Sequence, residues 1–299
     1  MRAWWFRIEA PTYLLWVLTY VAWGLLTWHV ERLPWWLVVG LGGIVVCLHG
    51  SLQHEALHGH PALTPIVNTV LALLPIGLWM PYAVYRDSHL AHHRCVRLTD
   101  PSSDPESFYV PASRWRQWPR WRQRIYEVNN TLLGRMLVGP WLVVATYWAN
   151  TLREWRAPHF SHRRAWVLHI ALLMLIGIWL TLCGVPLWLY IVGFAWPGLS
   201  LTLLRSYYEH RTDGKPGHQS IIVEGSWFTR LLFLNNNFHA VHHALPGVPW
   251  YELPRHYWPR RDAVFENNGG FRFRSYGDLW RHYATRPKDS PVYSDPAAT

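Results

Sequence analysis

Residues 34–60 read PWWLVVGLGGIVVCLHGSLQHEALHGH, an apolar run that leads directly into closely spaced histidines. A helix that spans a membrane needs about 20 mostly apolar residues, and residues 34–53 meet this requirement. Three further stretches of the same kind cover residues 12–31, 166–185 and 186–206. The sequence therefore predicts an all-α fold, a polytopic membrane protein with about four transmembrane helices.

The predicted spans form two hairpins, because a short turn joins the members of each pair, near residues 31–34 and near residues 184–186. Arginines gather in the long segment between the hairpins: Arg114, Arg116, Arg120, Arg122, Arg124, Arg153, Arg156, Arg163 and Arg164. Cytoplasmic loops of membrane proteins carry an excess of Lys and Arg. We therefore expect that segment and both termini to lie in the cytoplasm.

Two other apolar stretches are poor candidates for spans. Residues 64–82 contain Pro75 and Pro81, and only 30 residues separate His58 from His89, whereas two crossings would need about 40. We expect this stretch to lie at the membrane interface, and the same for residues 131–150, which Gly139-Pro140 interrupts.

Nine histidines show spacings that suit metal binding. They are His54 and His58, the lone His210, and two HxxHH clusters, His89, His92 and His93 and His239, His242 and His243. Positions i, i+3 and i+4 share one face of a helix, so we expect each cluster to present two or three imidazoles to the same point. Imidazole suits iron, zinc, copper and nickel. One ion rarely takes more than six ligands, so the count predicts two metals close together.

The domain organisation follows from these spans and clusters. We expect one domain over residues 1–299, in which residues 207–285 form a helical cytosolic cap that holds the metal site. Residues 287–299 contain two prolines and small polar side chains, a composition typical of a disordered tail.

The composition excludes an ordinary soluble protein. Hydrophobic residues make up 51% of the chain and charged residues only 15%, against a usual charged share of about 25%. The segment 114–124, RWRQWPRWRQR, alternates Arg with Trp. Beside membrane spans this pattern favours contact with anionic membrane lipids, so we expect no nucleic acid partner. None of the three cysteines forms a CxxC pair, which favours reduced thiols.

The first cluster has a second interpretation. His54-Glu55-Ala-Leu-His58 matches HExxH, the motif in which two histidines bind zinc and the Glu acts as the base of a metalloprotease. A catalytic zinc needs three protein ligands and a water, whereas at least seven further histidines gather in this sequence. A membrane zinc protease is therefore the alternative of a different class, and a histidine-rich membrane metal carrier is a third.

With these residues in view, the chain resembles the integral-membrane fatty acid desaturase superfamily, which includes hydroxylases and ketolases. The resemblance rests on the order HExxH, HxxHH, HxxHH and covers roughly residues 35–255. Residues 54–60 (HEALHGH), 89–94 (HLAHHR) and 236–246 (NNFHAVHHALP) are similar to a bacterial branch that includes dihydrorhizobitoxine desaturase. The resemblance implies an integral protein of the bacterial inner membrane.

The resemblance also implies a centre of two iron ions, held at the cytosolic membrane face by the nine histidines. In desaturases of known fold an Asn one turn before the lone histidine contacts a water on the metal, and Ser206 stands at that place here. Metal-bound imidazoles usually donate their other N–H to a carboxylate or carbonyl. The residues that could bind metal or hold the imidazoles in this way are His60, Ser206, Glu55, Asp87, Asp104, Glu106, Glu209 and Asn236.

The expected reaction is O2-dependent oxidation of an unactivated C–H bond, with desaturation of a lipid-like acyl chain or related small metabolite as the first choice. Hydroxylation or ketolation of a hydrocarbon or carotenoid is the alternative within the superfamily. The fused haem domain of some relatives, with its HPGG signature, does not occur in this sequence. We therefore expect a separate electron donor, a ferredoxin or similar protein.

Overall fold

The computed structural model describes residues 4–156, 161–213, 215 and 217–293, and helices dominate these residues. Four helical stretches are long and apolar enough to cross a membrane. They are α2 (Ala10–Trp28), α3 (Trp35–Leu57), α10 (Arg163–Leu182) and the continuous stretch Leu187–Glu209, made of α11 (Leu187–Tyr190), the π-helical η2 (Ile191–Ala195) and α12 (Trp196–Glu209). The predicted all-α polytopic fold is confirmed.

The chain forms two compact units. The first unit contains residues 1–86 and 141–202, and the second contains residues 87–140 and 203–299. The single domain that the sequence predicts over residues 1–299 stays a prediction. Each unit is built from two separate chain segments because the boundaries fall inside α5 (Tyr82–His93), near the start of α9 (Gly139–Trp155) and inside α12.

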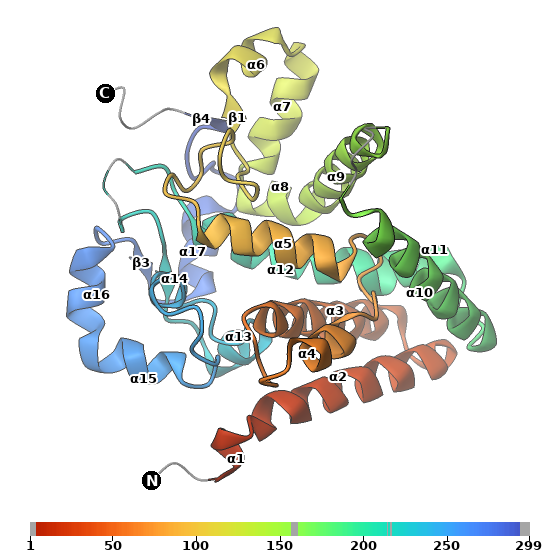
Figure 1. Cartoon of the computed structure of the whole chain (residues 1–299). Coiled ribbons are helices and arrows are strands. Elements are labelled where there is room, and N and C mark those ends of the chain that lie inside the picture. Colours follow the sequence, from red (N-terminus) through yellow and green to blue (C-terminus); the bar gives the residue numbers. More distant parts are fainter. Residues whose placement is uncertain (1–3, 157–160, 214, 216, 294–299) are drawn as a thin grey trace. The chain divides into compact units, whose positions relative to one another are not determined.

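In the first unit α2 and α3 lie side by side (Figure 1). The buried residues of α2 recur every three or four positions: Thr12, Trp16, Thr19, Trp23 and Thr27. This spacing gives the helix one packed face, whereas Leu14, Val17 and Val21 on the other face are more than half exposed. An apolar face without protein contacts is what a helix presents to lipid.

Glycines bring α3 and η2 together within the same unit. A Cβ added to Gly42 would lie 2.4 Å from the carbonyl oxygen of Gly193. The two backbones therefore approach so closely that there is no room for a side chain larger than that of glycine at position 42. Small residues serve this purpose at helix contacts in membranes. Nearby, Trp23 Nε1 donates to Tyr190 Oη at 2.8 Å, and Tyr190 Oη donates to the carbonyl of Ile76 at 2.7 Å.

The two stretches predicted to lie at the interface contain short helices. Residues 64–82 include α4 (Pro65–Ala72), whose eight residues are far fewer than the about 20 needed for a crossing. Residues 131–150 contain α8 (Leu132–Leu137) and most of α9, which begins at Gly139 with Pro140 in its first turn. Their location at the membrane surface stays a prediction. The first unit also contains α1 (Trp4–Arg7) and η1 (Val30–Arg32).

The second unit combines short helices with two pairs of parallel strands. β1 (Val110–Pro111) pairs with β4 (Val292–Tyr293), and β2 (Ile222–Val223) pairs with β3 (Arg272–Phe273). The helices after β1 are α6 (Ala112–Gln117), α7 (Arg120–Asn129) and α8. Those after α12 are α13 (Trp227–Leu232), α14 (His239–Ala244), α15 (Leu253–Tyr257), η3 (Trp258–Arg260), α16 (Arg261–Asn267) and α17 (Tyr276–Tyr283).

The expected disordered tail is wrong for residues 287–293. β4 lies beside β1 (Figure 1), and the backbone N–H of Val110 donates to the carbonyl of Pro291 at 2.9 Å. Only 8% of the Lys288 side chain is exposed. Polar composition suggested disorder, but hydrogen bonds to distant segments hold this stretch in place. The rest of the predicted tail, residues 294–299, lies outside the described residues.

Candidate metal centre

The end of α3 places the first two histidines. The helix runs four residues past the predicted span, so His54 lies in its last turn and His58 caps it. Gly59, with φ of 96°, then ends the helix in the left-handed conformation. Its N–H donates to the carbonyl of Ala56 and the N–H of His60 donates to that of Glu55, which is the Schellman arrangement that stops helices at glycine. The rings of His54 and His58 consequently lie 4.9 Å apart, centroid to centroid.

Both HxxHH clusters lie on helices of the second unit, His89–His93 on α5 and His239–Ala244 as α14. Two imidazoles of each cluster turn to one place, and the third turns to another. His89 and His93 group with His242, whereas His92 groups with His210, His239 and His243. Each cluster thus gives its i, i+4 pair to one group and its middle histidine to the other.

Helix geometry explains this division. At about 100° per residue, positions i and i+4 differ by about 40° around the axis, whereas i+3 lies about 60° away on the opposite side. The middle histidine therefore points to a different place from the outer pair. Because α5 and α14 have the same spacing, the middle ring of each helix meets the outer pair of the other.

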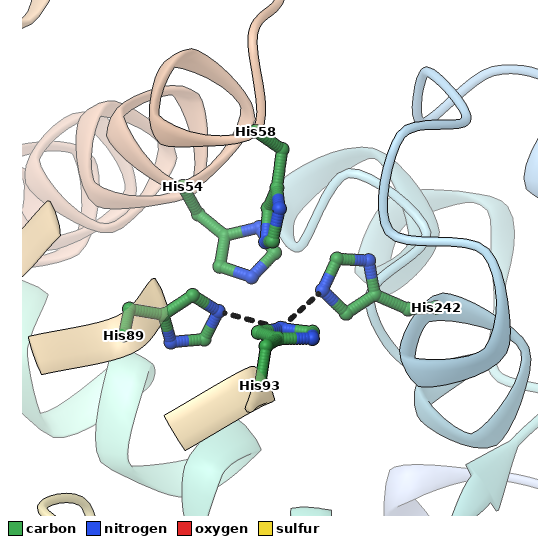
Figure 2. Close-up of side chains that lie close together, drawn as sticks. All are labelled: His54, His58, His89, His93 and His242. Carbon is green, nitrogen blue, oxygen red and sulfur yellow. Dashed lines mark hydrogen bonds between the residues drawn. The ribbon is translucent and has the colours of Figure 1, made fainter. Parts of the chain in front are cut away.

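The three-histidine group combines α5 and α14. Figure 2 shows His93 between His89 and His242, with dashed lines joining their ring nitrogens. Nε2 of His93 lies 3.0 Å from Nε2 of His89 and 3.1 Å from Nε2 of His242. Figure 2 also labels His54 and His58, which come from the end of α3 in the first unit.

The four-histidine group lies wholly within the second unit. One potential ligand atom from each of its members, His92, His210, His239 and His243, lies within 4.8 Å of the others. Nε2 of His210 lies 3.0 Å from Nε2 of both His92 and His239. Nε2 of His243 is buried and has no hydrogen-bond partner among the described residues.

These donors fit a metal ion. An imidazole nitrogen sits about 2.1 Å from a bound metal ion, so two ligand nitrogens at about 90° to each other on such an ion lie about 3 Å apart. The Nε2 separations of 3.0 and 3.1 Å match that spacing. A buried ring nitrogen without a partner, as in His243, is costly unless something binds it.

Three of the expected side chains hold the other ring nitrogens, and a fourth, Glu209, supports one of these three. Asp104 Oδ1 lies 2.8 Å from Nδ1 of His92, and Glu106 Oε2 lies 3.0 Å from Nδ1 of His89. Asn236 Oδ1 lies 3.1 Å from Nδ1 of His239. The Asn236 amide nitrogen in turn donates to Glu209 at 3.1 Å, and Arg205 pairs with Glu209 at 2.9 Å. These contacts orient the rings so that Nε2 faces the potential metal.

The sequence did not reveal Ser220, whose hydroxyl lies 3.2 Å from Nδ1 of His210. An isolated antiparallel bridge between His210 and Ser220 brings the two together. A serine ten residues after a histidine carries no recognisable signal, so only the fold could identify it.

Burial keeps four of the ligand candidates neutral. It lowers the pKa of His210, His239 and His243 well below the usual histidine value, and neighbouring imidazoles add to the shift. For the same reasons the pKa of His93 falls to about 3. Histidine must be deprotonated at the nitrogen that binds metal, so these rings are in the required form at neutral pH.

Nearby carboxylates have the opposite effect on the pKa of a histidine. Burial alone would lower the pKa of His92, but the hydrogen bond to Asp104 and the charge of Glu106 raise it overall. Burial would likewise raise the pKa of Glu106, but the charge and hydrogen bond of His89 lower it to about 2. Glu106 is therefore ionised at neutral pH and can accept the proton of Nδ1 as a hydrogen bond.

A comparison with known protein families matches residues 31–275 to the family described as Fatty acid desaturase. The match covers most of the 299 residues and includes all nine histidines. The chain belongs to the fatty acid desaturase family. A search of curated proteins found no match to it.

Membership of the fatty acid desaturase family establishes an oxidoreductase with a lipid-like substrate in a membrane environment. Together with the four apolar helices it makes the chain an integral membrane protein. The histidine groups are compatible with bound metal. The zinc-protease interpretation of His54, Glu55 and His58 therefore has no support beyond the motif itself.

Other candidates have different surroundings. His60 belongs to neither group of potential ligands among the described residues; its Nδ1 instead lies 2.7 Å from Glu9 Oε1 in the first unit. Ser206 Oγ is buried without a hydrogen-bond partner in the part of the chain that the structure describes. Glu55 is buried next to His54. Metal-related roles for Ser206, Glu55 and Asp87 stay predictions.

Proposed function

We propose that the two histidine groups each bind one iron ion, and that the chain is an O2-dependent desaturase. Its substrate would be a lipid-like acyl chain or a related small metabolite, into which it introduces a C=C bond. The observation that carries this proposal is the reciprocal division of the two HxxHH clusters into two sets of closely spaced imidazoles. Family membership supports the reaction class.

We propose that His54 and His58 also bind iron, as the histidine pattern of the sequence predicts. His54 and His58 are neighbouring imidazoles at a helix end, the same kind of donor. This assignment uses all nine histidines of the sequence pattern.

Bound iron would supply the O2-dependent removal of hydrogen from an unactivated C–H bond, which protein side chains cannot perform. The residues of the chain would hold the iron and orient the imidazoles that bind it. Three imidazoles donate a hydrogen bond from Nδ1 to a neighbouring side chain: His92 to Asp104, His89 to Glu106 and His239 to Asn236. These hydrogen bonds direct the Nε2 atom of each ring inward. Burial of both groups excludes water. Placement of the substrate within about an ångström then decides between alkene and alcohol.

Electrons would come from a separate donor, a ferredoxin or similar protein, at the cytoplasmic face of a bacterial inner membrane. The formal net charge of +10 supports an acidic donor, because complementary charge speeds encounter.

The decisive experiment compares hosts that express the wild type, His210→Ala or His282→Ala. His282 is the matched control, because it lies on α17 and its Nδ1 contacts the carbonyl of Asp278. Lipid and metabolite profiling should find a new double bond with the wild type and His282→Ala only, together with iron in the purified protein. A hydroxyl or keto product would favour the alternative reaction. An active protein with one zinc and no iron would contradict the proposal.

A further inference from the structure

Lys288 lies at the end of α12, the helix that leads to His210. Its ammonium group donates to the carbonyl of Tyr207 at 3.0 Å and to that of His210 at 2.5 Å. The last carbonyls of a helix have no partner within the helix and carry partial negative charge. A buried lysine therefore supplies both the donors and the charge that this helix end needs.

Neighbouring residues fix Lys288 in turn. Asp289 accepts a hydrogen bond from the hydroxyl of Tyr109, and the Asn130 side chain donates to the carbonyl of Asp289 at 2.5 Å. Beyond them, β4 pairs with β1. We call residues 288–293 the C-terminal strap. The strap contacts two segments that are far apart in the sequence. One follows directly after Glu106, which contacts His89, and the other contains His210.

His210 has more need of such support than the other members of its group. The other three, His92, His239 and His243, lie on α5 and α14, whose helical hydrogen bonds fix their backbones. His210 instead follows the last residue of α12. Its backbone is held by the bridge to Ser220 and by Lys288, and its ring by Ser220.

We propose that the C-terminal strap positions the metal ligand His210, with Lys288 as the positioning residue. The inference rests on the proposed metal-binding role of His210. Lys288 touches neither metal nor substrate and acts through the His210 carbonyl. Since ligand geometry within about 0.5 Å decides how well a site holds its metal, loosening this backbone should weaken one of the two metal positions.

The test uses full-length protein in lipid nanodiscs and four variants: Lys288→Met, Lys288→Arg, His210→Ala and Lys215→Met. Lys215 is the matched control, because it is the only other lysine of the sequence and its side chain is exposed. Titration with Fe(II) or Co(II) measures affinity, and the Co(II) spectrum reports ligand geometry. Hydrogen exchange of residues 207–210 in the metal-free protein measures how firmly the strap holds this backbone when no metal is bound.

We expect Lys288→Met to bind one of the two metals about tenfold more weakly or worse, with an altered Co(II) spectrum, faster exchange at residues 207–210 and an unchanged overall unfolding temperature. Lys288→Arg should restore part of the affinity and Lys215→Met should match the wild type. Unchanged exchange and affinity in Lys288→Met would overturn the inference. So would equal loss of both metals together with general unfolding.

The two proposals fail in different ways. If His210→Ala binds metal as well as the wild type, the proposed function fails at this ligand, and the inference that rests on it fails too. If His210→Ala loses one metal while Lys288→Met loses none, only the inference about the strap is overturned.

Discussion

The imidazole rings of His93 and His243 stack with their centroids 4.2 Å apart and their planes 16° from parallel. His93 belongs to the three-histidine group and His243 to the four-histidine group. The two groups are therefore immediate neighbours within the second unit. Two metal ions bound to them would share one buried polar region, as cooperation in a single reaction requires.

The first prediction concerns metal content. The wild type should contain two irons per chain, and His210→Ala and His242→Ala should each lose one, because these residues belong to different groups. Both variants should lose turnover, as should His92→Ala. Elemental analysis of purified protein, followed alongside activity, measures this. His282→Ala should keep both irons and full activity, and an active His210→Ala protein would exclude His210 as a ligand.

The second prediction compares two buried acids of one turn. Asp104 holds Nδ1 of His92, whereas Asp100 accepts hydrogen bonds from Ser102. Asp104→Asn should lower iron affinity about 10- to 100-fold, the usual effect of removing a carboxylate behind a ligating histidine. Asp100→Asn should leave affinity within about twofold of the wild type. Metal titration measures the iron affinity of both variants. Equal effects of the two substitutions would show that the turn matters only for folding.

The third prediction concerns the contact between α3 and η2. Gly42→Ala should destabilise the protein by about 1–3 kcal/mol, the usual effect of overpacking, since the new methyl group would meet the Gly193 carbonyl. Gly40→Ala is the control on the same helix, because its Cβ would meet nothing within 4 Å. Thermal unfolding in nanodiscs compares them. A Gly42→Ala protein as stable as Gly40→Ala would mean that the helices do not approach so closely.

The fourth prediction concerns topology. Reporter fusions at residues 5, 120 and 290 should all indicate the cytoplasm, because arginines concentrate between the two hairpins and four crossings return the chain to its starting side. A periplasmic signal at residue 120 would mean that residues 64–82 cross the membrane, despite the eight-residue length of α4.

The fifth prediction concerns α7. Trp121, Ile125 and Val128 form an exposed apolar stripe at positions i, i+4 and i+7, flanked by Arg122 and Arg124. Replacement of Arg120, Arg122 and Arg124 by Gln should slow turnover at low salt with limiting donor, and it should flatten the decrease of rate with ionic strength.

Membrane lipid is the competing partner for these arginines. A spin label at residue 125 measures whether α7 contacts the bilayer. If the triple variant keeps its donor dependence but α7 leaves an anionic bilayer, the arginines bind lipid head groups and the docking prediction is wrong.

The sequence predicted the elements whose signals are local. Long apolar runs defined the four spans, and the spacing of His89, His92 and His93 identified potential ligands. The roles of Asp104 and Glu106 as partners of those imidazoles were also predicted from their position next to the cluster.

What the sequence could not predict depends on contacts between distant segments. The division of each HxxHH cluster is visible only when α5 and α14 face each other. Ser220 reaches His210 through a two-residue bridge. Residues 287–293 looked disordered because composition does not record that Lys288 contacts carbonyls about 80 positions earlier.

The exchange of histidines between α5 and α14 has a consequence for how the protein acquires its metals. An ion that binds either group immobilises both helices, and the second ion then meets rings that are already ordered. The second binding step costs less conformational entropy than the first. Metal uptake should therefore be cooperative, so that half-loaded molecules are scarce and the chain passes from empty to fully loaded within a narrow range of free iron.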